Sequence, residues 1–436
     1  TVAVTALDID GATDIGAALV DADLFIIDDG AGGTNRKATA ARLATYINAT
    51  AGALTHKEGG TNFTNSLLVG TLSTGTLDAA DGNTGVGTSV FAALTSGDNN
   101  VAVGFSALTS NTSGASNTVV GRSAMSTNTT GACNVAIGQN ALLQNTEGDA
   151  NVAVGRFALD NNTTADNNTA VGYESLGANT TGSGNVAIGK SALVANTTAD
   201  FNTAVGRQAM FTNTTGTRNS VLGLNAMYSN TTGGHNVAVG DGALYANTTG
   251  GCNTAVGRSA LLANTTGLYN TATGENSLST NTTGCCNTAV GEYALKANTT
   301  ANDNTAVGLN SLKTNTTGAS NAAVGKDALA ANTTGNLNVA VGTDSLKANV
   351  DGYNNTAVGY TALQNNTNGV CNTAVGLEAL GSNTTADHNT AVGISALGTN
   401  TTGASNVAVG SKALTANTTG CRNVAVGRNA LLDNTT

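Results

Sequence analysis

A unit of 17 residues, repeated without a slip, is the feature that most constrains how this chain can fold. Asn100, Asn117 and Asn134 are 17 residues apart, and the same spacing continues to Asn423, which makes 20 consecutive units. A degenerate unit begins at Asn83 and a fainter one at Ser66. Ordering each residue costs about 1–2 kcal/mol, whereas burying one large apolar side chain contributes about 1.5–3 kcal/mol. One unit therefore cannot fold alone, and the repeat predicts a stacked array whose neighbouring units share a core.

Five positions of the unit, numbered from its first Asn, carry the regularity. Positions 1 and 12 are Asn and position 5 is Gly in all 20 units, position 9 is Leu in 17 and Met in three, and position 4 is Val, Ile or Leu except at Thr273. We expect positions 4 and 9 to be the buried apolar residues of each coil. We expect Gly to adopt a backbone shape that a Cβ would forbid, and the two Asn to form hydrogen-bonded ladders along the axis. In the first units these structural residues are Asn100, Gly104, Leu108, Asn117, Gly121 and Gly138.

The repeat predicts a mainly β protein. Positions 1–5 are typical of a short strand, because β-branched residues are followed by Gly. Positions 6–12 fit either a second strand or a single helical turn. The expected fold is a parallel β-roll or β-helix of about 21 coils over residues 66–436, and at a strand spacing of ~4.8 Å it forms a rod on the order of 100 Å long. The chain contains no Pro, which agrees with a ladder that needs nearly every backbone N–H.

Residues 1–65 lack the clear repeat and are typical of a small α+β cap or connector domain. The apolar run Leu24–Ile27 predicts a buried strand. Thr34 or Asn35 is expected to cap a helix. The apolar face of that helix would consist of Ala40, Leu43, Ala44 and Ile47. Such a domain would cover the open end of the solenoid, where a bare strand edge otherwise invites pairing.

Two stretches of the repeat resemble known protein families. Asn-Val-Ala-Ile-Gly at 134–138 and 185–189 resembles the head repeat of trimeric autotransporter adhesins. Asn-Thr-Ala-Val-Gly-Tyr at 355–360, with Ala-Leu and Asn-Thr after it, resembles repeats of phage tail fibres and bacterial surface fibres. The resemblance covers residues 83–436. It implies a parallel β-roll, often trimeric, that is displayed outside the cell or on a virion.

The distribution of charge argues against several function classes. The net charge is -10, and the 17 Lys and Arg residues are scattered, so the basic patch that nucleic-acid binding needs is missing. No apolar stretch approaches the ~20 residues of a membrane span, and we expect no membrane insertion. No catalytic constellation or cofactor motif stands out, and the three His fall in expected loops without a partner at ligand spacing. We therefore expect a protein that is not an enzyme and has no cofactor.

Asp8, Asp10 and Asp14 form the one candidate metal site. Closely spaced carboxylates suit a hard cation such as Ca²⁺. The same residues are also typical of an ordinary polar turn, which is the interpretation that we favour. A phosphatase-like nucleophile loop fits poorly, because the spacing is off by one residue and no matching Lys and acidic pair follows at a usable distance.

The six cysteines occupy two adjacent positions of the unit. Position 17 holds Cys133, Cys252, Cys286 and Cys371, and position 16 holds Cys285 and Cys421. The closest pair that is not adjacent in sequence lies two coils apart, or ~9.6 Å at the spacing of strands, whereas a disulfide needs Cα atoms within ~7 Å. Regular intrachain bridges are therefore excluded, which leaves a vicinal 285–286 bond, links between chains, or free thiols.

Asn at position 12 begins an Asn-x-Ser/Thr acceptor for N-glycosylation in 17 of the 20 units. The acceptor is lost at Asn145, Asn349 and Asn366, yet Asn itself stays, which favours a structural role for its side chain. An outward glycan and an inward ladder exclude each other for one Asn, and both interpretations remain open here. The candidate glycosylation residues are Asn111, Asn128, Asn162, Asn179, Asn196, Asn213, Asn230, Asn247, Asn264, Asn281, Asn298, Asn315, Asn332, Asn383, Asn400, Asn417 and Asn434.

These observations favour a structural protein, the protomer of an extracellular filament or a virion fibre that associates with itself. Because the given sequence stops inside a unit, we expect a neighbouring subunit to complete that edge in a head-to-tail filament, with a trimer as the other arrangement. The first alternative is an adhesin or receptor-binding tail-fibre module with a cell-surface or glycan receptor. The second is ice binding by Thr ladders at positions 2, 13 and 14.

Overall fold

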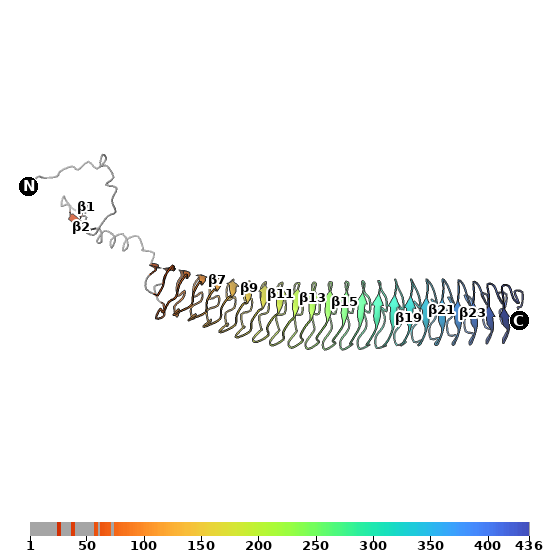
Figure 1. Ribbon diagram of the computed structural model, residues 1–436. Helices are drawn as coiled ribbons and strands as arrows, with labels where there is room; N and C mark the ends of the chain where they lie inside the picture. The colour runs from red at the N-terminus through yellow and green to blue at the C-terminus, as the bar shows by residue number, and fades with distance from the viewer. Residues whose placement is uncertain (1–23, 28–35, 40–55, 60–61, 71–73, 436) are drawn as a thin grey trace, which may run out of the picture.

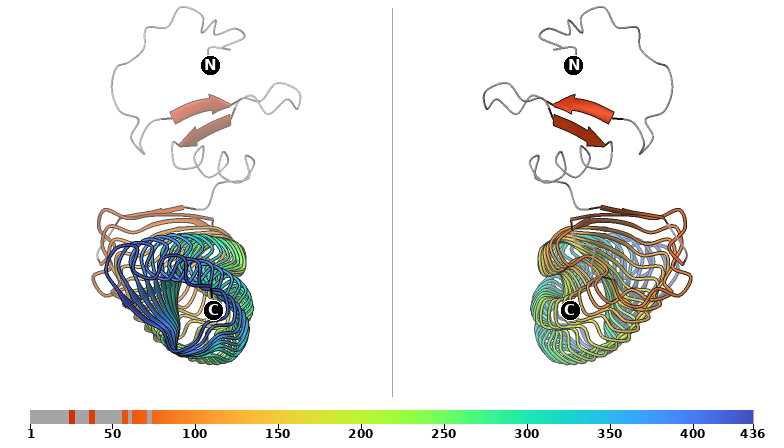
Figure 2. Two further views of the ribbon diagram at one scale, coloured as in Figure 1. Left: turned by 90° about the vertical axis from the view of Figure 1, so that its right-hand side faces the viewer. Right: turned by 90° about the vertical axis from the view of Figure 1, so that its left-hand side faces the viewer.

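The computed structural model describes residues 24–27, 36–39, 56–59, 62–70 and 74–435. Residues 74–435 form a parallel β-solenoid that extends as a single long rod (Figure 1). Each coil contributes one strand of three or four residues, and every strand pairs in register with the strand 17 residues before it. Seen along the axis, the coils superpose on one another with a gradual rotation (Figure 2). The prediction of a solenoid of about 21 coils is therefore confirmed.

The strands of the rod form one continuous sheet. It begins with β3 (His56–Glu58), which pairs antiparallel with β4, and all later pairs are parallel. Among the described strands β25 pairs only with β24, so the sheet is open rather than closed into a barrel. The remaining strands are β4 (Leu67–Gly70), β5 (Thr84–Gly87), β6 (Val101–Val103), β7 (Thr118–Val120), β8 (Val135–Ile137), β9 (Val152–Val154), β10 (Thr169–Val171), β11 (Val186–Ile188), β12 (Thr203–Val205), β13 (Ser220–Leu222), β14 (Val237–Val239), β15 (Thr254–Val256), β16 (Thr271–Thr273), β17 (Thr288–Val290), β18 (Thr305–Val307), β19 (Ala322–Val324), β20 (Val339–Val341), β21 (Thr356–Val358), β22 (Thr373–Val375), β23 (Thr390–Val392), β24 (Val407–Val409) and β25 (Val424–Val426).

Positions 6–12 form neither of the two structures expected of them. The chain makes tight turns there, with Ala107 N–H donating to Gly104 O at 3.4 Å and Asn111 N–H donating to Leu108 O at 3.3 Å. Backbone bonds to the next coil continue through these turns, for example from Leu108 N–H to Ala124 O at 3.2 Å. The single sheet is therefore only one part of a backbone ladder that surrounds the whole coil.

Positions 7, 9 and 17 adopt positive φ along the array, and they are residues other than Gly except at Gly184 and Gly242. In the coil that begins at Asn117 they are Ser123, Met125 and Cys133, with φ of 54°, 49° and 58°. This region costs an L-residue roughly 1–2 kcal/mol. Leu or Met tolerates it at position 9 because the side chain is fully buried there, and that burial offsets a strain of this size.

Glycine at position 5 has the conformation that the sequence predicts. Gly121 has φ of 145°, and a Cβ on it would lie 2.4 Å from Gly138 O in the next coil. Two coils cannot stack at this spacing if either carries a side chain at the position. The requirement for Gly is thus both conformational and steric.

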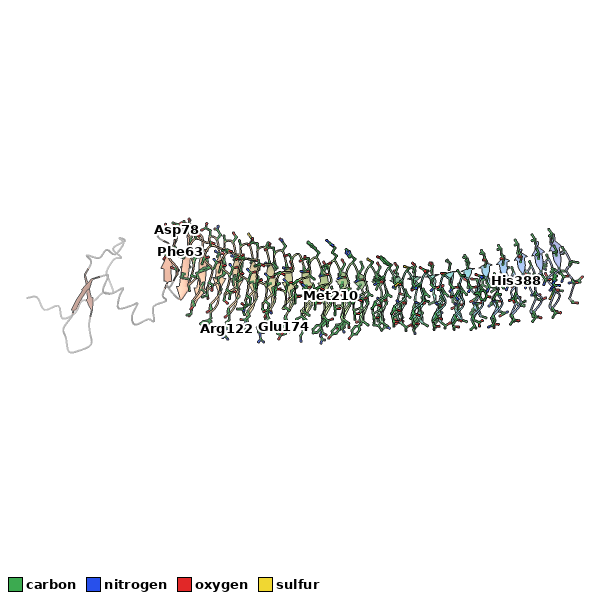
Figure 3. The ribbon with its side chains drawn as sticks, turned by 90° about the horizontal axis from the view of Figure 1, so that it is seen from below. Phe63, Asp78, Arg122, Glu174, Met210 and His388 are labelled. Atoms are coloured by element: carbon green, nitrogen blue, oxygen red, sulfur yellow. The ribbon has the colours of Figure 1, made fainter. Side chains whose placement is uncertain are left out.

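The core of the rod is narrow and half polar. Position 9 is buried as predicted, with Leu108 and Met125 both 0% exposed. The prediction for position 4 is wrong, because Val120 and Ile137 are 39% and 40% exposed and face outward. The buried strand residue is instead position 3, Ala or Val, because side chains alternate along a strand and Asn at position 1 also points inward. Met210 lies in this core, whereas Arg122 and Glu174 lie at the edge of the rod (Figure 3).

The N-terminal predictions can be compared only in part. Leu24–Ile27 is a strand as expected (β1), and it pairs antiparallel with β2 (Arg36–Thr39). The prediction of a helix that begins after Thr34 or Asn35 is wrong at the helix start. Strand β2 occupies that stretch, and its residues pair one by one with those of β1. The proposed apolar face of Ala40, Leu43, Ala44 and Ile47 lies outside the described residues. His56 lies in strand β3 rather than in a loop.

Candidate functional site

The two Asn of each coil form the ladders that the repeat predicts. Asn117 Oδ1 accepts from the backbone N–H and the Nδ2 of Asn134 at 3.0 and 3.1 Å. Asn111 Oδ1 accepts from Asn128 Nδ2 at 2.7 Å. Both columns are 0% exposed from Asn100 to Asn151, and the pattern continues coil after coil. Because each amide donates and accepts, the polar half of the core is satisfied along the axis.

The same geometry decides between the two interpretations of position 12. Asn230 Nδ2 is buried and donates to Asn213 Oδ1 at 2.7 Å and to Gly233 O at 3.0 Å. N-glycosylation would attach a sugar to this nitrogen and break both bonds. The ladder geometry contradicts glycosylation at position 12 from Asn111 to Asn417, where every acceptor Asn is 0% exposed in the folded rod. Asn434 is half-buried and donates to Asn417 Oδ1 at 3.4 Å.

Threonine at position 13 forms a third column that serves the fold. Thr112 Oγ1 donates to Thr129 O at 3.0 Å, and Thr129 Oγ1 donates to Thr146 O at 3.0 Å. These hydroxyls are half-buried and engaged, whereas position 14, as at Thr130, is exposed. The Thr ladder expected at position 13 is thus present, and it bonds to the protein rather than presenting its hydroxyls to a ligand.

The outward strand residues form a uniform surface along the rod. Positions 2 and 4 of β6 to β25 are Val, Thr, Ile, Leu, Ser or Ala in every coil, and none of them is charged. Val120, Ile137 and Val324 are each about two-fifths exposed. We call this surface, made of positions 2 and 4 of strands β6–β25, the strand face. At ~4.8 Å per strand it extends for on the order of 100 Å.

In contrast to the strand face, positions 6, 7, 10 and 11 vary from coil to coil and include charged residues. Arg258 forms an ion pair with Glu275 of the next coil, and Lys347 Nζ lies 2.9 Å from Asp344 Oδ1. Burial raises the pKa of Asp160 at position 10 to about 6, with a smaller contribution from the charge of Glu174. Exposed pairs of this kind contribute little to stability.

Aromatic side chains also stack on this variable surface. At position 10 the rings of Phe211, Tyr228 and Tyr245 lie on three successive coils, with centroids 5.0 and 5.2 Å apart and nearly parallel planes. The spacing of the coils brings equivalent side chains into contact along the axis. At position 6, Phe105 and Tyr360 are exposed on coils far apart in the rod.

All six cysteines are free thiols. Four of them are exposed and two, Cys285 and Cys371, are half-buried. The Sγ atoms of Cys285 and Cys421 accept weak hydrogen bonds from Leu268 N–H and Ala404 N–H of the preceding coil, at 3.4 and 3.3 Å. The vicinal 285–286 bond is therefore absent.

No metal centre is assigned within the described part of the chain. No group of three or more His, Cys, Asp or Glu side chains is placed there to hold an ion. Asp8, Asp10 and Asp14 lie outside the described residues. Those described residues also include no helix with the length and apolarity of a membrane span.

Comparison with family models, curated proteins and solved structures found no match for this chain. Its class is therefore defined by its geometry alone. It is an open parallel β-solenoid with one short strand per 17-residue coil, two internal Asn ladders and an uncharged strand face.

Proposed function

We propose that this chain is a structural protein, the protomer of an extracellular filament or a virion fibre, and that its rods associate through the strand face. The observation that supports the proposal is the absence of charge at positions 2 and 4 in all 20 consecutive units, although these positions are exposed or half-buried along the whole rod. The resemblance to fibre and adhesin repeats supports the extracellular or virion setting.

The repeat allows the strand-face positions to be compared with the other exposed positions of the same coils. At positions 6, 7 and 10 the same 20 units accept Arg, Lys, Asp and Glu, as at Arg122, Glu174 and Lys313. Strands disfavour Lys and Glu only mildly, so strand propensity alone does not account for their complete absence at positions 2 and 4. Large exposed apolar surfaces mark interaction sites in soluble proteins. We infer that another surface covers the strand face.

A second copy of the same chain is the occupant that fits. Its strand face has the same coil spacing, so side chains from two faces can interdigitate along the entire rod, as in sheets packed ~10 Å apart. Some 40 side chains that each bury about 50 Å² give on the order of 2,000 Å² per rod, which is within the range of permanent interfaces. A pair or a trimer of rods would satisfy this requirement.

The experiment introduces charge on the strand face and nowhere else. Val239→Lys with Val256→Lys places two Lys on adjacent coils of this face. Thr249→Lys with Thr266→Lys is the matched control, because these two residues are exposed at position 14 of the same coils. Size-exclusion chromatography with light scattering should show an oligomer for the wild type and the control, and a smaller species for the strand-face variant. A monomeric wild type, or equal masses for all three proteins, would refute the proposal.

Ice binding is a second candidate function, because the strand face is uncharged and regular. The Thr hydroxyls at position 2, as at Thr169 and Thr254, have no hydrogen-bond partner among the described residues. The strand face is therefore a better candidate than position 13, whose hydroxyls are engaged. A thermal-hysteresis assay distinguishes the two functions: ice binding predicts hysteresis that the strand-face Lys variant loses, and the structural proposal predicts none.

A further inference from the structure

The regular surface of the rod is interrupted by a cleft near its C-terminal end. Position 10 carries a side chain in most coils, and in three successive coils these side chains stack as an aromatic row. Gly381 and Gly398 occupy position 10 in two adjacent coils, so two consecutive side chains are missing from this row. The result is a cleft of about 540 Å³, with Gln364 at one end and Thr415 at the other.

The walls of the cleft present polar side chains, among them two that form no hydrogen bond within the described residues. Tyr360 is 55% exposed, and neither its hydroxyl nor the Gln364 amide has a hydrogen-bond partner within the described residues. The Glu378 carboxylate also lines the cleft and accepts from Ser395 Oγ at 3.2 Å. A free amide, a phenol and a carboxylate thus converge beside one exposed aromatic face.

We propose that this cleft binds a neutral sugar of one or two pyranose rings. Sugar hydroxyls donate to a carboxylate and exchange hydrogen bonds with an amide, and the apolar face of a pyranose ring packs on an aromatic side chain. The single acidic group in the lining disfavours anions, and one carboxylate is too few for a Ca²⁺ site. The volume lies within the ~300–1,000 Å³ of small-molecule sites.

The cleft is independent of the strand face. Its lining comes from positions 6, 7, 10 and 11, whereas the strand face comes from positions 2 and 4. A rod that associates through its strands can therefore still bind sugar in the cleft. Failure of one proposal leaves the other untouched.

The test uses the full chain on a printed array of neutral and sialylated glycans, followed by calorimetric titration with lactose, cellobiose and maltose. Gly398→Leu restores at position 10 the side chain that Leu143 and Leu262 carry there, and it fills the cleft. Tyr360→Ala removes the aromatic wall. Tyr173→Ala is the matched control, since it removes an exposed Tyr at the same position of a distant coil.

The proposal predicts that the wild type and Tyr173→Ala bind neutral glycans, and that Gly398→Leu and Tyr360→Ala bind them about tenfold more weakly or not at all. Circular dichroism of all four proteins should be the same. If Gly398→Leu alters the spectrum, Gly381→Leu and Tyr360→Ala decide the result. No binding to any neutral glycan, binding to sialylated glycans only, or full affinity in the cleft variants would overturn the proposal.

Discussion

Asn117 and Asn128 of one coil donate from their Nδ2 atoms to the same acceptor, the carbonyl oxygen of Gly131, at 2.9 Å each. Position 15 thereby joins the two Asn ladders across the interior of the coil. The arrangement explains why both Asn positions are invariant within the array, including the units whose glycosylation acceptor is lost. Three residues widely spaced in the unit act as one hydrogen-bonded set.

Removal of one ladder Asn should destabilise the rod strongly. In Asn230→Ala the Asn213 Oδ1 acceptor and the Asn247 Nδ2 donor both lose a buried partner. The expected loss in the free energy of unfolding is about 3 kcal/mol, because buried polar groups are left unsatisfied. Urea unfolding measures it, with Thr232→Ala, an exposed residue of the same coil, as the control. Equal midpoints for the two variants would contradict the structural role of the ladder.

Two glycines of one coil should respond differently to the same added methyl group. Gly206 has φ of 136°, and a Cβ would lie 2.3 Å from Gly223 O, so Gly206→Ala should cost about 3 kcal/mol or more. A Cβ on Gly216 would likewise lie 2.4 Å from Gly233 O, but its φ is ordinary for an L-residue and four other coils carry Ala at this position, 15. Gly216→Ala should therefore cost only about 1 kcal/mol.

Natural Ala residues show how position 15 adapts. Around Ala199 only the Thr197 N–H bonds to Thr214 O, at 3.3 Å, whereas around Gly216 both Thr215 and Gly216 also donate to the next coil. The methyl group is thus accommodated at the expense of two weak bonds. Thermal unfolding of the two variants measures the difference, and a Gly206→Ala protein as stable as Gly216→Ala would contradict the stacking geometry.

The half-buried Asp160 predicts a local dependence of stability on pH. Its pKa is raised from 3.8 to about 6, chiefly by burial. Between these values the folded state binds more protons than the unfolded state, so the free energy of unfolding falls as the pH rises and is constant above about 6. Asp160→Asn should therefore be more stable than the wild type at pH 8, by about 1 kcal/mol after solvent screening, and equally stable at pH 3. If Asp160→Asn is more stable than the wild type by the same amount at both pH values, the raised pKa of Asp160 is not the cause.

The six thiols should all react with Ellman's reagent in the native protein, because none is paired. Cys285 and Cys421 should react more slowly than the exposed Cys252, since their Sγ atoms also donate to Thr283 O and Thr419 O at 3.3 and 3.4 Å. Cys285→Ser should remove one slowly reacting thiol. Fewer than six reactive thiols, or a peptide mass that indicates a 285–286 disulfide, would contradict the structure.

Much of the fold could be predicted from the repeat alone. The coil number, the Gly at position 5, the buried residue at position 9 and the Asn ladders all follow from periodicity joined to simple stereochemistry. Cysteines that are not adjacent in sequence lie at least two coils apart, and this spacing likewise excluded regular disulfide bridges within the chain. These features are repeated in every coil, so each is supported by 20 copies of the same pattern.

Other features could not be predicted because they depend on the path of the chain around a narrow coil. The strand has only three residues, with β-branched residues on both sides of a small Ala, as in Val135–Ile137, so its alternation does not reveal which side is buried. The core accepts Ala and leaves Ile exposed because two Asn columns already occupy the interior. The positive φ of Leu108 had no signal in the sequence, since Leu is an unusual residue in that region. The cleft arises from two glycines at a position that otherwise varies freely.

Cryo-electron microscopy of the purified protein tests the central claim most directly. We predict coils spaced ~4.8 Å apart, rods paired or grouped with their strand faces in contact, and no branched density at Asn128, Asn179 or Asn230. Single rods whose strand face is open to solvent, with sugar density on those three Asn, would contradict both the association through the strand face and the internal Asn ladder.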